Sequence, residues 1–338
     1  MFVRTVLAMS LSCMFASTAF AAATAEQPLE PQVVSVADPI DPLATTASSA
    51  AITPQEQQDL NQAAKTLGDL QQAENSSADI GMAASEATVT TTNTQQSAQP
   101  AVKASWTLDG LNNAAWYDNI GKGQFPVYAR AHVMLSNAYA SPGAIDGTSG
   151  KNTLKAISTF QQINGLKPTG ELTKETWDLL VSKQGSRPAF VEYTISQADA
   201  KVPLAKSIPR DYALQAKMPG LYYTSMTEML AEKFHMDEGF LKQLNPKASF
   251  KVGDKIVVAN VSNKLPEDIH LIVAHKGAKQ LYLFNSRNQM IGSFPASIGS
   301  TNTPSPTGTY KITGVARNPH YSYSPSNFIQ GNNTKPLS

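Results

Sequence analysis

Residues 22–104 limit where this chain can build a hydrophobic core, because they contain no aromatic residue. Ala, Thr, Ser and Gln dominate the segment, as in the run at residues 88–96. Such a composition buries too little apolar area to offset the entropy that a chain loses on folding. We therefore expect residues 22–104 to form a disordered linker with at most one weak helix, between Thr53 and Leu70. The linker would act as a tether across a periplasm-like space, or as a spacer without a selected length.

The first 21 residues have the layout of a secretory signal peptide. Arg4 supplies a short positive region, residues 6–15 form an apolar stretch, and Ala19-Phe20-Ala21 has the small residues of a cleavage site. No later segment approaches the 18 or so apolar residues of a membrane span. We therefore expect an exported protein, in a periplasm or cell wall, with no membrane span after cleavage.

The single cysteine of the chain, Cys13, lies inside this predicted signal peptide. Cleavage after Ala21 would leave no disulfide, no cysteine nucleophile and no thiolate metal site. Lipidation of Cys13 is the alternative, but Ser10 stands three residues earlier, where a leucine is usual. The net charge of +1, with 16% charged residues, gives no basic surface for nucleic acid. We expect no cofactor and no nucleic-acid partner.

Ordered structure is expected from Trp106 onward, in a unit that spans residues 105–184. The apolar spacing predicts three helices, of which the first starts at Pro126 and the second is broken by Asn164-Gly165. The third starts at Thr173, with Glu175 near its positive N-terminus. The expected inward residues are Val127, Ala131, Leu135 and Ala138 on the first helix, Leu154, Ile157 and Phe160 on the second, and Trp177 and Leu180 on the third.

This pattern resembles the small peptidoglycan-binding domain that is often fused to cell-wall enzymes. The matching motifs are Ile145-Asp146-Gly147, Phe160-Gln161, Gly165-Leu166 and Gly170-Glu171-Leu172. The resemblance implies peptidoglycan, its glycan strands and stem peptides, as the partner. The possible contacts in this unit are Asp146, Gln161 and Asn164, although an Asp-Gly pair is also a common turn and the apolar residues of the motifs fit a core.

Residues 185–264 are expected to form a β-α-α-β unit. Residues 190–195 and 250–258 are strand-like, and Ser225-Met226-Thr227-Glu228 is a capping box at a helix start. Asn245-Pro246 ends a second short helix, because proline cannot continue it. The unit resembles a lysin-motif module, which binds N-acetylglucosamine chains, and Asn245 is its possible peptidoglycan contact. An insertion with Pro203, Pro209 and Pro219 departs from the motif, so the unit either braces the C-terminal part or binds a ligand.

Residues 265–338 predict a β-meander with Pro and Gly at its turns. The expected strands cover residues 269–275, 280–285, 290–299 and 309–315. Phe294-Pro295-Ala296-Ser297-Ile298-Gly299 and the motif at residues 304–310, continued at 315–319 and 328–331, resemble the first half of an L,D-transpeptidase catalytic domain. That family cross-links or anchors bacterial peptidoglycan through a cysteine acyl-enzyme.

The resemblance places the family's nucleophile in a His…Ser-x-Gly-Cys-x-Arg segment, downstream of Ser338. We therefore assign no catalytic residue and expect a truncated, inactive chain. Its sheet should have an unpaired edge and a one-sided core. The absence of Ser-x-x-Lys, Gly-x-Ser-x-Gly and His-Glu-x-x-His motifs argues against other hydrolases and transpeptidases.

The sequence thus predicts a multi-domain α+β protein. It would have a disordered N-terminal tail, a three-helix peptidoglycan-binding-like domain, a lysin-motif-like module and a partial all-β transpeptidase domain. The alternatives to a transpeptidase-family protein are a non-enzymatic peptidoglycan-binding protein, attached through residues 126–183 and 221–261, and a purely structural remnant.

Overall fold

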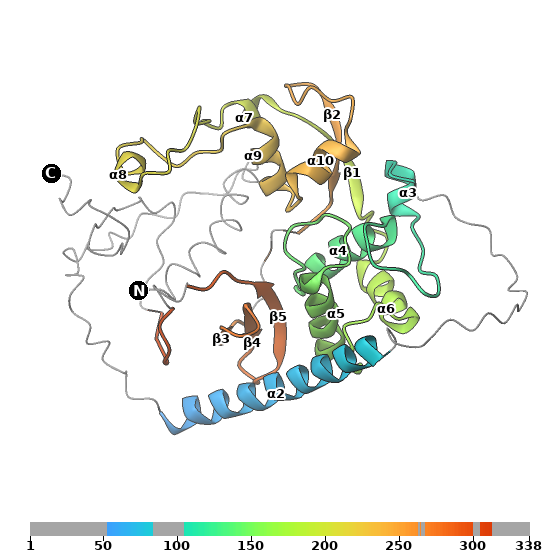
Figure 1. Ribbon diagram of the computed structural model, residues 1–338, viewed down its shortest axis with the longest axis vertical. Helices are drawn as coiled ribbons and strands as arrows, with labels where there is room; N and C mark the ends of the chain where they lie inside the picture. The colour runs from blue at the N-terminus through green and yellow to red at the C-terminus, as the bar shows by residue number, and fades with distance from the viewer. Residues whose placement is uncertain (1–52, 84–104, 263, 265–267, 300–304, 313–338) are drawn as a thin grey trace, which may run out of the picture.

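The computed structural model describes residues 53–83, 105–262, 264, 268–299 and 305–312 (Figure 1). The predicted signal peptide and the linker residues 22–52 and 84–104 lie outside the described residues. No described helix is both long and apolar enough to cross a membrane. In chain order the elements are α2 (Pro54–Ala83), α3 (Leu108–Asn112), α4 (Pro126–Asn137), α5 (Lys151–Ile163), α6 (Lys174–Gln184), β1 (Phe190–Thr194), α7 (Gln197–Ala200), α8 (Tyr212–Gln215), α9 (Met226–Lys233), α10 (Glu238–Leu244), β2 (Lys255–Ala259), β3 (Leu271–His275), β4 (Gln280–Phe284) and β5 (Met290–Pro295).

Helices α4, α5 and α6 pack around one hydrophobic core, as the sequence predicts. The Thr173 hydroxyl accepts the N–H of Thr176 at 3.2 Å and so caps α6. The prediction for Leu154 is wrong, because its side chain is 47% exposed. Thr153 points inward instead, and its hydroxyl donates to the carbonyl of Thr148 at 2.8 Å. That hydrogen bond fixes the rotation of α5, whose buried apolar residues are Ala156, Ile157 and Phe160.

β1 and β2 form a two-stranded antiparallel sheet, in which Phe190 lies opposite Ala259. Both α9 and α10 lie between these strands in the sequence, and the insertion before them holds the four-residue helices α7 and α8. The Ser225 hydroxyl accepts the Glu228 N–H at 3.0 Å, as the capping box predicts. The Glu228 carboxylate, however, accepts the N–H of Thr224 at 2.7 Å, one residue before the expected donor.

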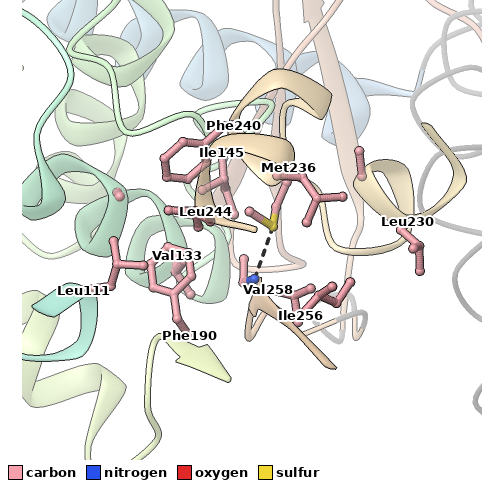
Figure 2. Packing of buried hydrophobic residues seen from close by; sticks show 14 of the residues in the cluster. Leu111, Val133, Ile145, Phe190, Leu230, Met236, Phe240, Leu244, Ile256 and Val258 are labelled. Carbon is pink, nitrogen blue, oxygen red and sulfur yellow. Dashed lines mark hydrogen bonds between the residues drawn. The ribbon is translucent and has the colours of Figure 1, made fainter. Parts of the chain in front are cut away.

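The three-helix unit and the β1–β2 unit share a hydrophobic core (Figure 2). Leu111, Val133 and Ile145 come from the helical side and contact Phe190, Met236 and Phe240 of the other unit. The backbone reinforces this junction, since Ile145 N–H donates to His235 O at 2.8 Å and Asp237 N–H donates to Ile145 O at 3.0 Å. These two units are therefore packed together, although the sequence divides them at residue 184.

Strands β3, β4 and β5 form an antiparallel sheet in chain order. Leu271 lies opposite Phe284 in the first pair, and Tyr282 lies opposite Ser293 in the second. The prediction of a strand at residues 309–315 is wrong for residues 309–312, which form no strand. Residues 313–315 lie outside the described residues. The reason is that residues 305–312 find no strand to pair with among the described residues.

Part of the outer edge of β5 bonds to the helical unit, through one bridge between Ser293 and Ala140. At the other edge of the sheet, β3 pairs with no further strand among the described residues, so the expected unpaired edge is present there. Ser293 N–H donates to Tyr139 O at 2.8 Å, and Ser141 N–H donates to Ser293 O at 2.9 Å. Tyr139 has a positive φ of 61°, which turns the chain after α4 so that it can run beside β5. The helical unit thus satisfies backbone groups that would otherwise face solvent.

One face of this sheet is covered by α2, which crosses it along the base of the view in Figure 1. Ala63, Leu67 and Leu70 of the helix pack against Tyr282 and Phe284 of β4. This helix is longer than the weak helix expected at residues 53–70, and it corrects the linker prediction for residues 54–83. Its apolar residues are few, but they follow the spacing i, i+4 and i+7 and gain their burial from the sheet.

Candidate functional site

Asp146, the first predicted contact, lies in the loop that leads into α5. Its Oδ1 accepts the N–H of Thr148 at 2.7 Å, and its side chain is 41% exposed. Partial burial raises the pKa of Asp146, although the Thr148 N–H acts in the opposite direction. Asp146 therefore combines a fixed backbone turn with a carboxylate that solvent or a ligand can reach.

Behind Asp146 lies a buried imidazole, His132 on α4. The Thr153 hydroxyl already donates to Thr148 O, so the 2.9 Å contact with His132 Nε2 requires a proton on that nitrogen. His132 Nδ1 is then an acceptor without a hydrogen bond, 3.7 Å from Asp146 Oδ1. Burial lowers the pKa of His132 to about 4, so the ring is neutral at physiological pH.

Gln161, the second predicted contact, is buried inside the helical unit with 1% of its surface exposed. Its amide nitrogen donates to Glu171 O at 3.0 Å and to Thr176 Oγ1 at 2.9 Å. Its amide oxygen accepts the N–H of Gly170 at 3.0 Å. These bonds tie α5 to the loop before α6, so Gln161 serves the fold and offers no polar group to a ligand in this structure.

The side-chain amide of Asn245, the fourth predicted contact, is also hydrogen-bonded within the fold. Its nitrogen donates to Leu241 O and Val257 O, each at 2.9 Å, and its oxygen accepts the N–H of Val257 at 2.6 Å. It nevertheless lines an open cavity of about 330 Å³ where α10 ends and β2 begins. Lys247 and Asp254 line the same cavity, so the groups that could meet a ligand there are neighbours of the predicted residue.

Asn164, the remaining predicted contact, lies at the end of α5 in the wall of a second cavity, of about 470 Å³. Its amide nitrogen donates to Phe160 O at 2.6 Å, and its side chain is partly exposed. We call this space the junction cavity, because α4, α5 and α6 line it together with Ile291 of β5. The full lining is Met134, Asn137, Ala138, Tyr139, Ile163, Asn164, Lys183, Gln184 and Ile291.

The described residues hold no cluster of three or more His, Cys, Asp or Glu side chains that could bind a metal ion. Three of the described histidines have structural partners: His132 contacts Thr153, His270 Nε2 lies 3.3 Å from Asp59 Oδ2, and His275 Nδ1 accepts the N–H of Ala278. Burial lowers the pKa of His235.

Sequence reasoning did not single out Lys183 or Ile291 as candidate site residues, although both line the junction cavity. Lys183 has a simple alternative role, since a cation in the last turn of a helix is favourable. Ile291 joins the cavity because β5 runs beside residues 139–141, and no local pattern indicates that pairing. A polar residue at a helix end, such as Asn164, was the one signal that pointed to this region.

Comparison with known families agrees with the resemblances to a peptidoglycan-binding domain and to an L,D-transpeptidase catalytic domain, and it leaves the lysin-motif resemblance untested. Residues 131–180 match the family model of the peptidoglycan binding domain, which here covers α5, most of α4 and α6, and includes Asp146 and Asn164. Residues 269–336 match the family model of the L,D-transpeptidase catalytic domain, which here includes β3, β4 and β5. A search of curated proteins gave no match to the chain.

Proposed function

We propose that this chain, which contains a peptidoglycan-binding domain and a segment of the L,D-transpeptidase catalytic domain, is a cell-wall protein of the L,D-transpeptidase family that attaches to peptidoglycan. The helical unit would bind the wall, and the sheet of β3, β4 and β5 would lie beside the bound polymer. One observation carries this proposal: the two parts are joined by direct backbone hydrogen bonds.

The joint consists of several independent contacts. Besides the two backbone bonds of Ser293 to residues 139 and 141, Ser293 Oγ donates to Thr159 Oγ1 at 3.0 Å. Lys155 Nζ donates to Ala278 O at 2.5 Å. Contacts from the loop after α4 and from α5 restrict rotation of the sheet against the helical unit. A wall-bound helical unit would therefore keep the transpeptidase segment close to its polymer.

Export to the periplasm or cell wall is part of the proposal, and it rests on the signal-like residues 1–21. Cleavage after Ala21 would give a mature protein that begins with Ala22. N-terminal sequencing of the protein recovered from the exported fraction tests this directly. Recovery of Arg4 in that protein would contradict it.

We also propose that residues 22–338, as a polypeptide on their own, transfer no acyl group through a cysteine. Cys13 is the single cysteine of the 338 residues and lies in the predicted signal peptide. The thiolate is the group that such a mechanism needs as its nucleophile. Incubation of this polypeptide with a donor stem peptide and an acceptor amine should yield no cross-linked product, and a product would overturn the proposal.

The β1–β2 unit is proposed to be a lysin-motif-like module. Its support is the order of two strands and two helices, with an antiparallel pairing of the strands around α9 and α10. The module would either brace the rest of the protein or bind an N-acetylglucosamine chain at the cavity beside Asn245. Titration with an N-acetylglucosamine tetramer separates these roles, because Lys247→Glu should weaken binding only if that cavity is occupied.

Co-sedimentation with purified peptidoglycan sacculi tests the main proposal. The protein is expected in the pellet, and Asp146→Ala should lower the bound fraction if this carboxylate meets the polymer. Asp178→Ala is the matched control, because Asp178 is an exposed acid of the same unit whose partner is Lys174. A wild-type protein that stays in the supernatant would contradict attachment to the wall. A variant that still binds sacculi but has lost some other activity of the protein would instead favour a role beyond attachment.

A further inference from the structure

The insertion between α7 and α9 extends away from the hydrophobic cores of the protein. Val202 and Tyr223, at its two ends, pack against the core that the β1–β2 unit shares with the helical unit. Between them, none of residues 203–222 is buried or belongs to a described core. We call residues 203–222 the arm. It includes the short helix α8, which lies far from α4, α5 and α6 in Figure 1.

Hydrogen bonds give the arm a defined backbone although it has no core. At its base, Ala205 N–H donates to Tyr223 O at 2.8 Å. At α8, the Asp211 carboxylate caps the helix, and Gln215 Nε2 donates to Pro209 O at 2.8 Å. The three prolines of the arm further limit its conformations. The arm therefore presents its side chains on a preformed loop and does not collapse them into a core of their own.

Several large apolar side chains of the arm face solvent. Of the ten such exposed side chains among the described residues, four lie in the arm: Leu204, Tyr212, Leu214 and Leu221. Leu214 is 50% exposed and Leu221 is 47% exposed. Single exposed apolar residues are normal in folded proteins. A group of them in one segment without a core indicates a contact surface.

The arm is also basic. It contains Lys206, Arg210 and Lys217 but only one acid, Asp211, and Lys201 precedes it at its base. All four cations are exposed. Together these residues have a net charge of +3, which exceeds the +1 of the whole chain. Each exposed leucine of the arm lies within four positions of a cation. The contact surface thus mixes apolar and positively charged groups and complements an anionic partner.

This mixture favours a lipid surface as the partner. In a bilayer interface, leucine side chains reach the boundary of the acyl chains, while nearby Lys and Arg side chains meet anionic headgroups. Tyrosine, present in the arm as Tyr212 and Tyr222, is enriched at the same depth. Long cationic side chains can lie along apolar surface and keep their charge among the headgroups. A soluble polyanion would meet the cations but leave the leucines in water.

We propose that the arm binds a membrane surface that contains anionic phospholipids. Its leucines enter the boundary of the acyl chains, and its cations contact the lipid phosphates. This inference does not depend on the proposed attachment to the wall. Because α8 lies far from the helical unit, the arm would hold the protein at a membrane while the helical unit remains free to bind peptidoglycan (Figure 1).

Vesicle flotation of residues 22–338 tests the electrostatic part. This polypeptide keeps every contact described above and lacks the apolar signal-like stretch, which would itself enter a bilayer. It should float with vesicles that contain phosphatidylglycerol and not with vesicles of phosphatidylcholine alone. Lys206→Glu combined with Arg210→Glu should weaken binding by about tenfold or more. Lys151→Glu combined with Lys167→Glu makes the same change of charge at exposed residues of the helical unit and should leave binding unchanged.

A second pair of variants tests the apolar part. Leu221→Ser should weaken vesicle binding about fivefold, because it removes apolar area that the bilayer would cover. Leu154→Ser on α5 is the matched control, since Leu154 is also 47% exposed and lies outside the arm. Both leucines are partly exposed, so neither change removes a core residue. Sedimentation with sacculi should be equal for the arm variants and the wild type.

Each outcome is decisive. The proposal is overturned if the wild type does not float with anionic vesicles, or if the arm variants bind them as the wild type does. Loss of binding in the charge variant but not in Leu221→Ser would assign the arm to a soluble polyanion and also overturn it. A wild-type dimer that the arm variants dissociate, without vesicle binding, would assign the arm to a second copy of the chain. In all these cases sedimentation with sacculi still tests the proposed function separately.

Discussion

Asn288 Nδ2 donates a 2.7 Å hydrogen bond to Asp59 Oδ1, and so joins the turn between β4 and β5 to a helix 229 positions earlier. Asp59 is 6% exposed and is also contacted by Gln55 Nε2 at 2.8 Å and His270 Nε2 at 3.3 Å. Nearby, Lys311 Nζ lies 3.1 Å from Glu56 Oε1. Polar contacts thus fix the start of α2 on the sheet, while its apolar residues cover the sheet's face.

The first prediction concerns this docking of α2. Leu70→Ala removes a side chain that is 1% exposed and packs in the cluster with Phe284. A buried Leu→Ala change costs about 2–5 kcal/mol, so the helix should separate from the sheet much more often. Hydrogen exchange of the α2 amides should then accelerate. Gln57→Ala, an exposed change on the same helix, is the control, and equal exchange in both variants would contradict the docking.

Protein segments with clear local chemistry were predictable from sequence. The Thr173 cap, the inward Trp177 and the capping hydroxyl of Ser225 follow from rules that need only neighbouring residues, and the structure has all three. The docking of α2 was not predictable, because its apolar stripe of Ala63, Leu67 and Leu70 is too sparse to stand out. Its burial depends on a sheet more than 200 positions away.

In the candidate site, too, some features were predictable from neighbouring residues and others depend on distant parts of the fold. Sequence motifs located Asp146, Gln161 and Asn164 in one domain, but they could not distinguish an amide that binds a ligand from one that holds a loop. Gln161 has three backbone or hydroxyl partners from the segment at residues 170–176, and that arrangement appears only when the loop is folded. Lys183 lacked a motif altogether, and its position beside Asn164 in the wall of the junction cavity is a property of the fold.

The second prediction is a pH dependence from His132. Burial holds its pKa at about 4 in the folded protein, below the unfolded value of 6.5. Between these values the unfolded chain binds more protons, so the free energy of unfolding falls as the pH is lowered from 6.5 towards 4. The loss from this residue should total about 3 kcal/mol. Asp146, whose pKa is raised, acts in the opposite direction near and above 3.8.

Urea unfolding between pH 7 and 4.5 measures this dependence. His132→Gln keeps a donor near Thr153 but does not titrate, so it should flatten the pH profile relative to the wild type. His235, whose pKa burial also lowers, contributes to both proteins and cancels in the comparison. Parallel profiles of the two proteins would show that His132 is not the buried titrating group.

The third prediction concerns the ion pair between Lys233 and Asp199, which lies under the insertion of the β1–β2 unit. The two charges are 2.6 Å apart, and Asp199 is 1% exposed and also accepts from Tyr193 and Ser196. Lys233→Met leaves that carboxylate buried without its cation, which should cost about 3 kcal/mol. Lys242→Met, which breaks an exposed pair with Glu238, should cost less than about 1 kcal/mol. Thermal unfolding of the two variants compares them directly, and similar losses would contradict a buried pair.

The fourth prediction concerns the contact between β5 and the helical unit. A Cβ atom added at Gly292 would lie 2.9 Å from Tyr139 O and 3.2 Å from Tyr139 Cβ, so the backbone of one partner must shift. Gly292→Ala should therefore weaken the pairing of Ser293 with residues 139–141 and expose the edge of β5. A Cβ at Gly277 would meet His275 at an ordinary 3.4 Å, which makes Gly277→Ala the matched control.

Hydrogen exchange at Ser293 and Ser141 reads out this pairing, because both N–H groups bond across the joint. Both amides should exchange faster in Gly292→Ala and at the wild-type rate in Gly277→Ala. The exposed edge should also increase concentration-dependent association of the variant. Unchanged protection of both amides in Gly292→Ala would mean that the sheet and the helical unit are held together without this strand pairing. The connection between the two parts, on which the proposed function depends, would then have to come from the contacts of Lys155 and Thr159 alone.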